Sequence, residues 1–496
     1  MAILEADIAV IGSGFAGSLT ALIAERIGLR AVLIERGSHP RFAIGESSTP
    51  IADLVLAELA ERYDLPRLTP LTQYGSWRRA YPEVVCGRKR GFSYFRHERG
   101  RVFVPRDDHA NELLVAGNPD DDRADTHWFR ADFDAFLVNE AQAAGVHYLD
   151  RTLLHTLRPG ETWRLRGTRE ESPVDIRASF LVDATGGGGV LAAALGIEAN
   201  AAAMHTNSRT IYTHFAGVRP WQELYEGAGG SVADHPFDCD AAALHQIFDG
   251  GWMWVLRFDN GVTSAGLVLD RTRYPLDESI TPEDEWRAIV ARYPSIAEQF
   301  GTAEAIRPFC RTGRLQRSAA KTAGDNWAML PAAACFIDPL HSTGNAHSLV
   351  GIERLMRILE ETRPGADRTD RLAAYDRTTR REAELLDLIV HGGFVSFEHF
   401  DLMVAFSMLY FIGATFSEHR RREGRPTRDD GFLLSHDGRF VELVGRYYAD
   451  ACRLARSPTL GVAEIQAFRD ALFADVASYN VAGLCDETKR NMYGYE

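Results

Sequence analysis

EADIAVIGSGFAGSLTALIAERIGLRAVLIE, residues 5–35, contains the pattern from which the α/β class of this protein follows. A short apolar run is followed by a glycine-rich turn, a helical pattern and a second apolar run that ends at Glu35. Strand, glycine turn, helix, strand and acid in this order are typical of a dinucleotide-binding βαβ unit. The sequence therefore predicts a parallel sheet with a nucleotide at the carboxyl ends of its strands.

The glycines of this turn have a physical role in such a unit. They permit a tight turn and a close approach of the backbone, while the helix N-terminus presents free N–H groups to a pyrophosphate. An acid at the end of the second strand can accept hydrogen bonds from a ribose diol. A glycine turn without a ligand is the alternative, and NAD and FAD share the pattern. The expected cofactor contacts are Gly12, Gly14, Ala16, Gly17, Glu35 and Arg36.

A second β-type run, SFLVDATGGGG at 179–189, ends in another glycine turn. We interpret it as a returning strand of the same nucleotide domain, with Asp183 as a further cofactor contact, although a simple βα turn has the same composition. Alternating residues at 91–104, between the two units, and at 208–218 and 252–269, after the second, predict antiparallel strands. An antiparallel sheet is thus expected to be inserted into the nucleotide domain.

The chain becomes helical in pattern after about residue 345. We predict one domain over residues 1–375, with the antiparallel insert at about 80–110 and 205–310. An all-helical C-terminal region that covers the substrate follows at 376–496.

Two segments of the helical region have individual predictions. The apolar run Leu402–Phe416 is too short to span a bilayer comfortably, so we expect a buried helix. The loop at 421–431 is expected to be an exposed connection, and the Arg420–Arg422 run before it a solvated helix end.

Composition limits the classes of partner. The formal net charge of −14 argues against nucleic acid and against an anionic membrane surface, because both would repel the protein. The six cysteines form no CxxC pair and the N-terminus has no basic segment before its apolar run, so we expect a cytoplasmic protein with reduced thiols. His235, Cys239 and His245 lack a fourth ligand at a usual spacing, so we expect a surface loop there and no metal.

Lysine is rare in this chain. Of 55 basic residues only three are lysines, Lys89, Lys321 and Lys489, and the first lies in the strand-like stretch CGRKRGFSYF at 86–95. A lysine differs from an arginine because the pKa of its amine falls readily on burial, which allows it to act as an acid, a base or a nucleophile. An ordinary exposed cation is the alternative interpretation of Lys89.

The stretch FIDPLHSTG at 336–344 matches F-x-x-P-x-x-S-x-G, which lies against the flavin ring in flavin-dependent halogenases. Together with GSGFAG at 12–17, IGES at 44–47, RADFD at 130–134 and DATG at 183–186, it makes the first 360 or so residues resemble that family. The RKRGFSYF strand, the YTHF run and the long helical tail are more similar to the phenolic type than to tryptophan halogenases.

The resemblance implies a fold and a chemistry. The fold would be a two-dinucleotide-binding-type FAD domain with an inserted antiparallel sheet. Reduced FAD from a separate reductase, O2 and chloride or bromide would produce a hypohalous acid, which Lys89 would deliver to an electron-rich aromatic substrate of the phenolic type. Backbone amides at Thr343 and Gly344 would bind the halide, since consecutive N–H groups form an anion site.

Further roles follow from the same resemblance. Arg130, Glu46 and Ser47 are expected beside the flavin, although Arg130 could instead form a helix-start ion pair with Asp134. Relatives have Gly-Asp where this chain has Leu330-Pro331, so Asp338 could substitute as a flavin contact.

The family signature W-x-W-x-I-P is only partly present. Trp252 and Trp254 match, but Leu256 and Arg257 replace Ile-Pro, which is thought to suppress monooxygenase activity. A flavin-dependent aromatic hydroxylase is therefore the second hypothesis, and a non-catalytic flavin-binding protein the third.

The substrate is expected where the helical tail covers the antiparallel sheet. Aromatic residues are concentrated between 394 and 411, and some of them could sandwich an aromatic ring. The predicted substrate contacts are Phe406, Ser407, Tyr410 and His399. A homodimer is a further hypothesis, without a specific motif behind it.

Overall fold

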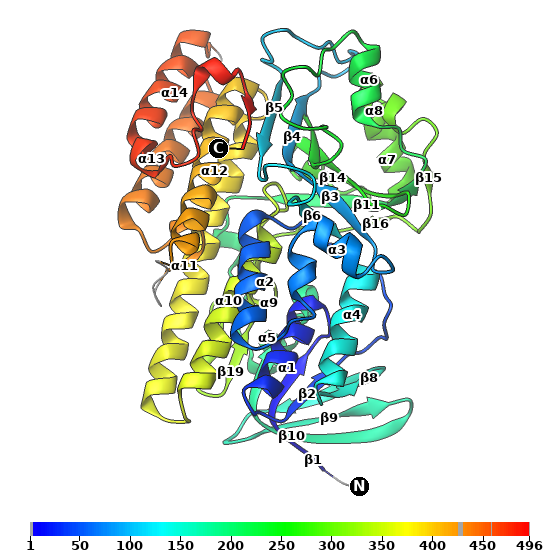
Figure 1. Cartoon of the computed structure of the whole chain (residues 1–496), viewed down its shortest axis with the longest axis vertical. Helices are drawn as coiled ribbons and strands as arrows, with labels where there is room; N and C mark the ends of the chain where they lie inside the picture. Colours follow the sequence, from blue (N-terminus) through cyan, green and yellow to red (C-terminus); the bar gives the residue numbers. More distant parts are fainter. Residues whose placement is uncertain (1–2, 425–429, 458, 496) are drawn as a thin grey trace.

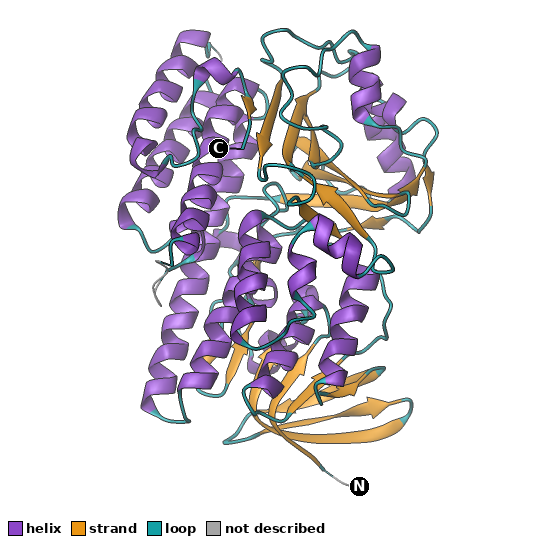
Figure 2. Cartoon of the chain, in the orientation of Figure 1, coloured by secondary structure: helices purple, strands orange, loops and turns teal. Residues whose placement is uncertain are grey.

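The computed structural model describes residues 3–424, 430–457 and 459–495. Figure 1 places the parallel sheet at one end of the molecule and the antiparallel sheet at the other, with the long C-terminal helices along one side of both. Figure 2 shows the same division into strands and helices. The predicted fold class is confirmed.

The nucleotide-binding half is built on a sheet with the order β18-β19-β10-β1-β2-β7. The antiparallel pair β8 and β9 extends it through β10, and β18 is antiparallel to β19. Its strands are β1 (Leu4–Ile11), β2 (Ala31–Ile34), β7 (His147–Leu149), β8 (Thr152–Arg158), β9 (Trp163–Arg169), β10 (Ser172–Asp183), β18 (Ala323–Gly324) and β19 (Trp327–Met329).

The returning strand lies directly beside the first. In the parallel pair of β1 and β10, Ile11 is opposite Asp183, and in the pair of β1 and β2, Ile11 is opposite Ile34. Gly12, Glu35 and Asp183 therefore emerge together from the carboxyl ends of three neighbouring strands. The prediction that 179–189 belongs to an interrupted nucleotide domain is confirmed.

The inserted sheet has the order β15-β11-β14-β13-β12-β4-β5-β21 and is mostly antiparallel. Its strands are β4 (Gly91–Arg96), β5 (Glu112–Ala116), β11 (Ser208–Ala216), β12 (Ala243–Phe248), β13 (Gly251–Arg257), β14 (Val262–Asp270), β15 (Glu304–Ala305), β16 (Cys310–Arg311) and β21 (Met492–Tyr493). Two separate two-stranded sheets pair β3 (Cys86–Lys89) with β6 (Asp125–Trp128), and β17 (Arg317–Ser318) with β20 (Cys335–Phe336). The strand that carries Lys89 thus lies between the two halves.

Helices cover both sheets. They are α1 (Phe15–Arg26), α2 (Pro50–Arg62), α3 (Tyr74–Ala80), α4 (Arg130–Ala143), α5 (Val190–Leu195), α6 (Trp221–Gly227), α7 (Pro282–Val290), α8 (Pro294–Gln299), α9 (Pro331–Ala334), α10 (Thr343–Glu361), α11 (Ala366–Ser396), α12 (Phe400–Arg422), α13 (Gly438–Ala455) and α14 (Val462–Val476).

The C-terminal region is helical as expected, with one exception. Its last strand, β21, returns to pair with β5 in the inserted sheet, and Figure 1 shows the C-terminus beside that strand. The predicted boundary between residues 375 and 376 falls inside the continuous helix α11. The helical region is therefore joined to both halves of the molecule.

The helix α12 is a core helix. By length and composition alone its 23 residues could cross a membrane, but most of the apolar window is buried inside the protein. It packs against α11, α13 and α14, and its buried positions surround the whole helix rather than one stripe. The prediction of a buried helix at 402–416 is confirmed.

The end of α12 differs from the prediction. Arg421 is not solvated: its guanidinium lies between Glu58 and Glu353, and 12% of the side chain is exposed. Glu58 belongs to α2 and Glu353 to α10, so this arginine joins three helices. Residues 425–429 of the predicted exposed loop lie outside the described residues.

Replacing Arg421 with alanine should destabilise the protein by about 2–3 kcal/mol, because two partly buried carboxylates would lose their shared cation. Urea unfolding of both proteins would measure the change. As a control, Arg453→Ala removes a mostly exposed ion pair with Asp450 on α13 and should cost less than about 1 kcal/mol. Equal effects of the two substitutions would contradict the buried role of Arg421.

Candidate active site

The glycine turn after β1 has the shape expected for a dinucleotide site. Gly12 has a φ of +99°, and a Cβ on it would lie 2.6 Å from the carbonyl oxygen of Ala184. A Cβ on Gly17 would lie 1.9 Å from the carbonyl oxygen of Gly12. Neither position can accept a side chain without moving the backbone, so both glycines are required by the packing of α1 against β1 and β10.

The acids at the strand ends are held by the backbone. Glu35 accepts hydrogen bonds from the N–H groups of Ser13 and Gly37 at 3.1 and 2.9 Å. Asp183 accepts from the N–H groups of Thr185 and Leu191, which shapes its own turn. Ala16 is buried in α1, and Arg36 is exposed beside Glu35. Glu35 thus remains at the position of a ribose contact, whereas Asp183 acts mainly on the turn.

Arg130 connects the two loops of the nucleotide site. Its guanidinium forms a two-point ion pair with Asp134 at 2.8 and 2.9 Å and donates to the carbonyl oxygens of Ile44 and Gly45. Asp134 in turn accepts a hydrogen bond from the N–H of Phe15 at 3.1 Å. The ion pair that is the alternative interpretation of Arg130 is present, and it positions the 44–47 loop against the N-terminus of α1.

The 336–344 stretch ends in the start of a long helix. Ser342 has a left-handed backbone, with φ 53°, and α10 begins at Thr343. The first N–H groups of a helix have no partner within the helix, so they can bind an anion. Gly344 is exposed, and apart from its chain neighbours and the backbone of its own helix none of the described residues lies within 4 Å of the position that a Cβ would take. A flat ring could lie against this backbone, so the residues present fit a flavin.

The 44–47 loop closes against this helix start. The hydroxyl of Ser47 is 3.2 Å from that of Ser342, and the amide of Asn345 donates to the carbonyl oxygens of Gly45 and Ser47. Glu46, in contrast, points away to His214, with 2.8 Å between its carboxylate and the imidazole nitrogen. Of these two predicted flavin neighbours, Ser47 thus lies at the helix start and Glu46 is engaged elsewhere.

Asp338 also faces away from the nucleotide half. Its carboxyl accepts hydrogen bonds from the Ser208 hydroxyl at 2.7 Å and from the N–H of Leu340 at 3.1 Å. Burial raises the pKa of Asp338 to about 7, and these hydrogen bonds oppose the shift. Because the carboxyl is engaged with β11 and with its own turn, it does not replace the missing Gly-Asp pair in this geometry.

Lys89 is fully buried at the end of β3. Its ammonium nitrogen donates to the carbonyl oxygen of Ser48 and lies 4.1 Å from the centre of the Phe92 ring. Asp125 is its cross-strand partner on β6. Burial lowers the pKa of Lys89 to about 8, while the carboxyls of Asp125 and Asp53 oppose the shift. The alternative of an ordinary exposed cation is therefore wrong.

Two carboxyls, those of Asp53 and Asp125, lie near Lys89, but both stabilise its positive charge less than ordinary carboxylates would. Burial raises the pKa of Asp125 to about 6 and, together with the charge of Asp125, raises the pKa of Asp53 well above its ordinary range. The two acids therefore hold protons more readily than free carboxyls do, which weakens the counter-charge on the lysine. Near neutral pH an amine in this site can lose its proton.

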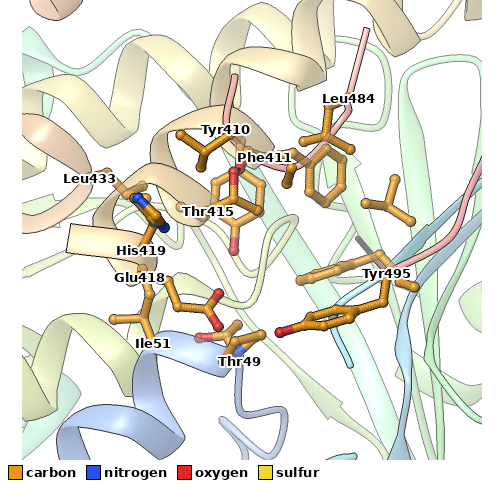
Figure 3. Close-up of a pocket in the computed structure, with 18 of the residues that line it drawn as sticks. Thr49, Ile51, Tyr410, Phe411, Thr415, Glu418, His419, Leu433, Leu484 and Tyr495 are labelled. Carbon is orange, nitrogen blue, oxygen red and sulfur yellow. The ribbon is translucent and has the colours of Figure 1, made fainter. Parts of the chain in front are cut away.

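A pocket lies on the other side of Phe92. Its volume of about 140 Å³ is close to that of an engineered cavity of about 150 Å³ that binds benzene. The walls come from the start of α2, β4 and β5, the C-terminal half of α12, and the chain's end, as Figure 3 shows in part. Phe92 contacts the Lys89 ammonium and also lines the pocket.

A second contact joins the helix start to the pocket. The imidazole of His341, in the 336–344 stretch, stacks on the ring of Tyr410 with 4.4 Å between centroids, and Tyr410 lines the pocket. Lys89, through Ser48 and Phe92, and His341, through Tyr410, thus connect the same two places. Both residues therefore lie between the start of α10 and the residues that line the pocket.

A model of the tryptophan halogenase family matches residues 126–392, which is more than half of the chain. The chain belongs to this family. It is a flavin-dependent halogenase that acts on aromatic substrates. It is 28% identical to the monodechloroaminopyrrolnitrin halogenase PrnC of Pseudomonas fluorescens, over 99% of this chain and 86% of that protein. It is 29% identical to the tetracycline 7-halogenase of Kitasatospora aureofaciens, over 80% of this chain and 71% of that protein.

Solved structures show the same fold. The halogenase PltM in complex with phloroglucinol and FAD matches with a TM-score of 0.85 and 24% identity, over 98% of this chain and 99% of that chain. The flavin-dependent halogenase CmlS matches with a TM-score of 0.64 and 19% identity, over 96% of this chain and 78% of that chain. The C-terminal helices of this halogenase are therefore part of a known architecture.

The predicted substrate contacts of the halogenase are only partly brought together. Tyr410 lines the pocket, whereas Phe406 packs against Gly392, and the Ser407 hydroxyl faces the sulfur of Met403 at 3.3 Å. His399 precedes α12 and does not line the pocket. Phe406 lies one turn before Tyr410 on the same face of α12, but the pocket wall begins only at Tyr410.

A carboxyl that no sequence pattern singles out lies in this pocket. Glu418 lines it with 8% of the residue exposed, and burial raises its pKa to about 7. Arg422 pairs with this carboxyl at 2.7 Å and donates to the Tyr495 hydroxyl at 2.8 Å. In the sequence, Glu418 stands in a charged helix end that has the composition of a solvated surface, and only the fold buries it.

The two tryptophans of the partial signature lie in β13, and neither lines the pocket. Trp252 stacks on His245, which in turn stacks on Tyr94, with centroid distances of 5.0 and 4.3 Å. Arg257, in the place of the family's proline, pairs with Asp240 at 3.0 Å. Because His245 and Cys239 are both buried, the prediction that these residues lie in a surface loop is wrong.

Proposed function

We propose that this halogenase transfers chloride or bromide to a phenolic ring, with reduced FAD from a separate reductase and O2 as co-substrates. Bound flavin supplies the reducing equivalents with which O2 converts halide to hypohalous acid. The position of Lys89 supports the rest of the proposal. The buried amine contacts Ser48, next to the Ser47 that meets the start of α10, and Phe92 of the pocket wall, so it can receive a small oxidant on one side and present it on the other.

The halide would bind at the N–H groups of Thr343 and Gly344. These groups begin α10, where the helix dipole favours an anion, and Gly344 faces open space. The nitrogen of Lys89 can then hydrogen-bond the hypohalous acid or bond to its halogen, releasing water. Transfer of the halogen to the ring carbon replaces a proton there and restores the amine.

A phenol fits the pocket better than an unsubstituted ring does. The volume matches one aromatic ring, Phe92, Tyr410 and Phe411 provide apolar faces, and Glu418 provides a buried acceptor for a hydroxyl hydrogen. A hydrogen bond to a carboxylate draws the proton from the phenol and raises the electron density of the ring. That the PltM structure contains phloroglucinol, a phenol, supports this class of substrate.

One assay tests the reaction and its main alternative. The protein is incubated with reduced FAD, O2, bromide and separate phenol, pyrrole and indole panels, and products are analysed by mass spectrometry. We expect phenols to gain the isotope doublet of bromine. Hydroxylated products without bromine would support the aromatic hydroxylase that the missing Ile-Pro suggests. No product from any panel would support a flavin-binding protein without turnover.

Replacing Glu418 with glutamine should raise the KM for phenols about 10-fold or more, since a hydrogen bond to a charged group is lost. The wild-type rate should fall as the pH drops below about 7, because the carboxyl takes up a proton and no longer accepts the phenol hydrogen. This acidic limb of the pH–rate profile, the fall in rate below about pH 7, should be absent in the Glu418→Gln protein. Product formation measured from about pH 5.5 to 8 would test both expectations.

The matched control is Glu442→Gln, on an exposed position of α13. It should leave the KM and the pH profile unchanged. A Glu418→Gln protein with the wild-type KM and the same limb near pH 7 would remove Glu418 from the site.

Three further features of the proposal concern the protein in its surroundings. All six cysteines are free thiols, which supports a reducing, cytoplasmic location. A separate reductase is implied by the family and can be tested by coupling the assay to a purified flavin reductase. The homodimer stays a prediction, which sedimentation would test.

A further inference from the structure

A cluster of two histidines and a glutamate lies at the edge of the inserted sheet. His109 and Glu112 come from the loop before β5 and its first residue, and His235 comes from the loop between α6 and β12. One donor atom from each lies within 4.8 Å of the other two. Only 5%, 0% and 1% of the three side chains are exposed, so water does not compensate them.

Three atoms of this cluster have no hydrogen-bond partner among the described residues. They are Oε2 of Glu112 and both ring nitrogens of His235. Buried polar atoms are almost always paired, because an unpaired one loses its hydration without compensation. His235 Nε2 and Glu112 Oε2 face each other across 3.5 Å, slightly too far for a good hydrogen bond. Both atoms are lone-pair donors to a cation in their ordinary forms.

We propose that His109, Glu112 and His235 bind a divalent transition metal, with zinc as the expected ion. Two imidazoles and one carboxylate are a familiar zinc donor set. Metal–ligand bonds of about 2.0–2.2 Å in a tetrahedron place donor atoms roughly 3.3–3.6 Å apart, and the 3.5 Å gap between His235 and Glu112 matches this edge. Small rotations of the imidazoles would complete the site.

The groups around the cluster orient it as metal sites require. Asp234 Oδ2 is 3.4 Å from His109 Nε2, which favours a proton on that nitrogen and leaves Nδ1, the atom directed toward Glu112, as the ligand in the metal-bound form. The Tyr225 hydroxyl donates to Glu112 Oε1 at 2.8 Å and leaves Oε2 for the ion. Carboxylate–histidine–metal arrangements of this kind raise the basicity of the ligand. The cation of Arg490 lies on the outer side of Asp234, at 2.6 Å.

Without a metal, His109 Nδ1 and Glu112 Oε1 share a hydrogen bond of 2.5 Å. Binding of the ion would replace that bond and release its proton, because a ligating imidazole nitrogen must be unprotonated. The same three side chains can thus exist in a hydrogen-bonded and a metal-bound arrangement.

The site would join the 231–240 loop to two segments beside the substrate pocket. Glu112 begins β5, whose Val115 and Ala116 line the pocket. Asn491, directly before β21, donates to the carbonyl oxygen of His109 at 3.0 Å, and Arg490 pairs with Asp234. A bound ion would therefore fasten the 231–240 loop to the strand pair β5 and β21. In Figure 1, β5 and α6 both lie at the end of the molecule that contains the antiparallel sheet. The site is independent of the flavin and of the proposed reaction.

The test begins with wild-type protein, purified without a histidine tag and supplied with zinc before dialysis. Inductively coupled plasma mass spectrometry should find about one zinc per chain, and zinc should raise the thermal unfolding midpoint of chelator-treated protein. Competition with a chromophoric chelator should show that His235→Ala weakens zinc binding by at least about 100-fold and Tyr225→Phe by about 10-fold.

The matched control is His147→Ala, which removes an exposed histidine at the start of β7 and should leave zinc binding unchanged. Wild-type protein that retains no zinc and shows no thermal shift would overturn the proposal. So would equal zinc affinities of wild type and His235→Ala, or an equal loss in the His147→Ala control. Since the readout is metal content, the result does not depend on which substrate the halogenase uses.

Discussion

Methionine in place of Lys89 should lower kcat/KM for halogenation by about 10³-fold or more, while the oxidation of reduced FAD by O2 continues at the wild-type rate. The side chain keeps nearly the same volume, but the amine between Ser48 and the pocket wall residue Phe92 is lost. Oxidant would still form and would escape into solution. Product formation by mass spectrometry and flavin oxidation by absorbance, measured on the same samples, would separate the two steps.

Arginine at the same position should be almost as inactive as methionine. A guanidinium stays charged at any accessible pH and is a poor nucleophile, whereas burial brings the pKa of Lys89 to about 8. For the same reason, the wild-type rate should gain from the neutral amine as the pH rises toward 8. This rise and the limb assigned to Glu418 near pH 7 can be told apart in the Glu418→Gln protein.

The control for Lys89 is Lys321→Met, which changes an exposed lysine that lies over Trp327 in the nucleotide half. It should leave both rates unchanged. Circular dichroism of the Lys89 variants should match the wild type, because the raised pKa values of Asp53 and Asp125 allow both acids to become neutral when the cation is gone. A Lys89→Met protein that halogenates at the wild-type rate would show that the amine has no part in the transfer.

Leucine in place of Gly344 should weaken FAD binding by about 100-fold or more. Apart from its chain neighbours and the backbone of its own helix, no described residue lies within 4 Å of the position of a Cβ there, and the residue is helical, so the protein itself can accommodate the side chain. The flavin ring that we place against this backbone could not. Quenching of flavin fluorescence on titration with FAD would measure the affinity, and thermal unfolding without FAD should be close to that of the wild type.

A matched control exists at the start of another helix. Gly438 also lies in a first helical turn, that of α13, with open space around its missing Cβ. Gly438→Leu should therefore leave FAD affinity and stability unchanged. If Gly344→Leu bound FAD as tightly as the wild type, the flavin would have to lie elsewhere, and the halide site proposed at Thr343 and Gly344 would lose its basis.

Much of the nucleotide half could be predicted because its determinants are local. The turn from Gly12 to Gly17 and the acid Glu35 lie within one βαβ unit, so spacing along the chain sets their spacing in the fold. The rarity of lysine and the family resemblance together indicate Lys89, and this residue lies buried between Ser48 and Phe92. The expectation that this residue acts in catalysis depends on the chemistry of an amine side chain, which is known from the residue type alone.

The pocket could not be predicted in the same way. An aromatic-rich helix favours Phe406 and Ser407 as substrate contacts, but only the tertiary structure decides that the cavity lies along α12 from Tyr410 onward and includes Glu418, whereas Phe406 packs against Gly392 of α11. Arg421, in a run with the composition of a solvated helix end, is enclosed by acids from α2 and α10. Helical periodicity predicts which residues share a face, but it does not predict whether that face contacts another helix or a cavity.

Residue chemistry and short-range spacing, both present in the linear chain, therefore specified the βαβ unit, the returning strand, the buried helix and the unusual amine. The tertiary structure alone decided which distant groups meet: Glu418 with the chain's end, Asp338 with β11, and His235 with His109 and Glu112. The physical reason is that burial and long-range contact set the pKa of an acid or the ligands of an ion. The pKa and the ligand set both depend on how the two sheets and the C-terminal helices pack. These contacts join residues far apart in the chain, so no local sequence pattern predicts them.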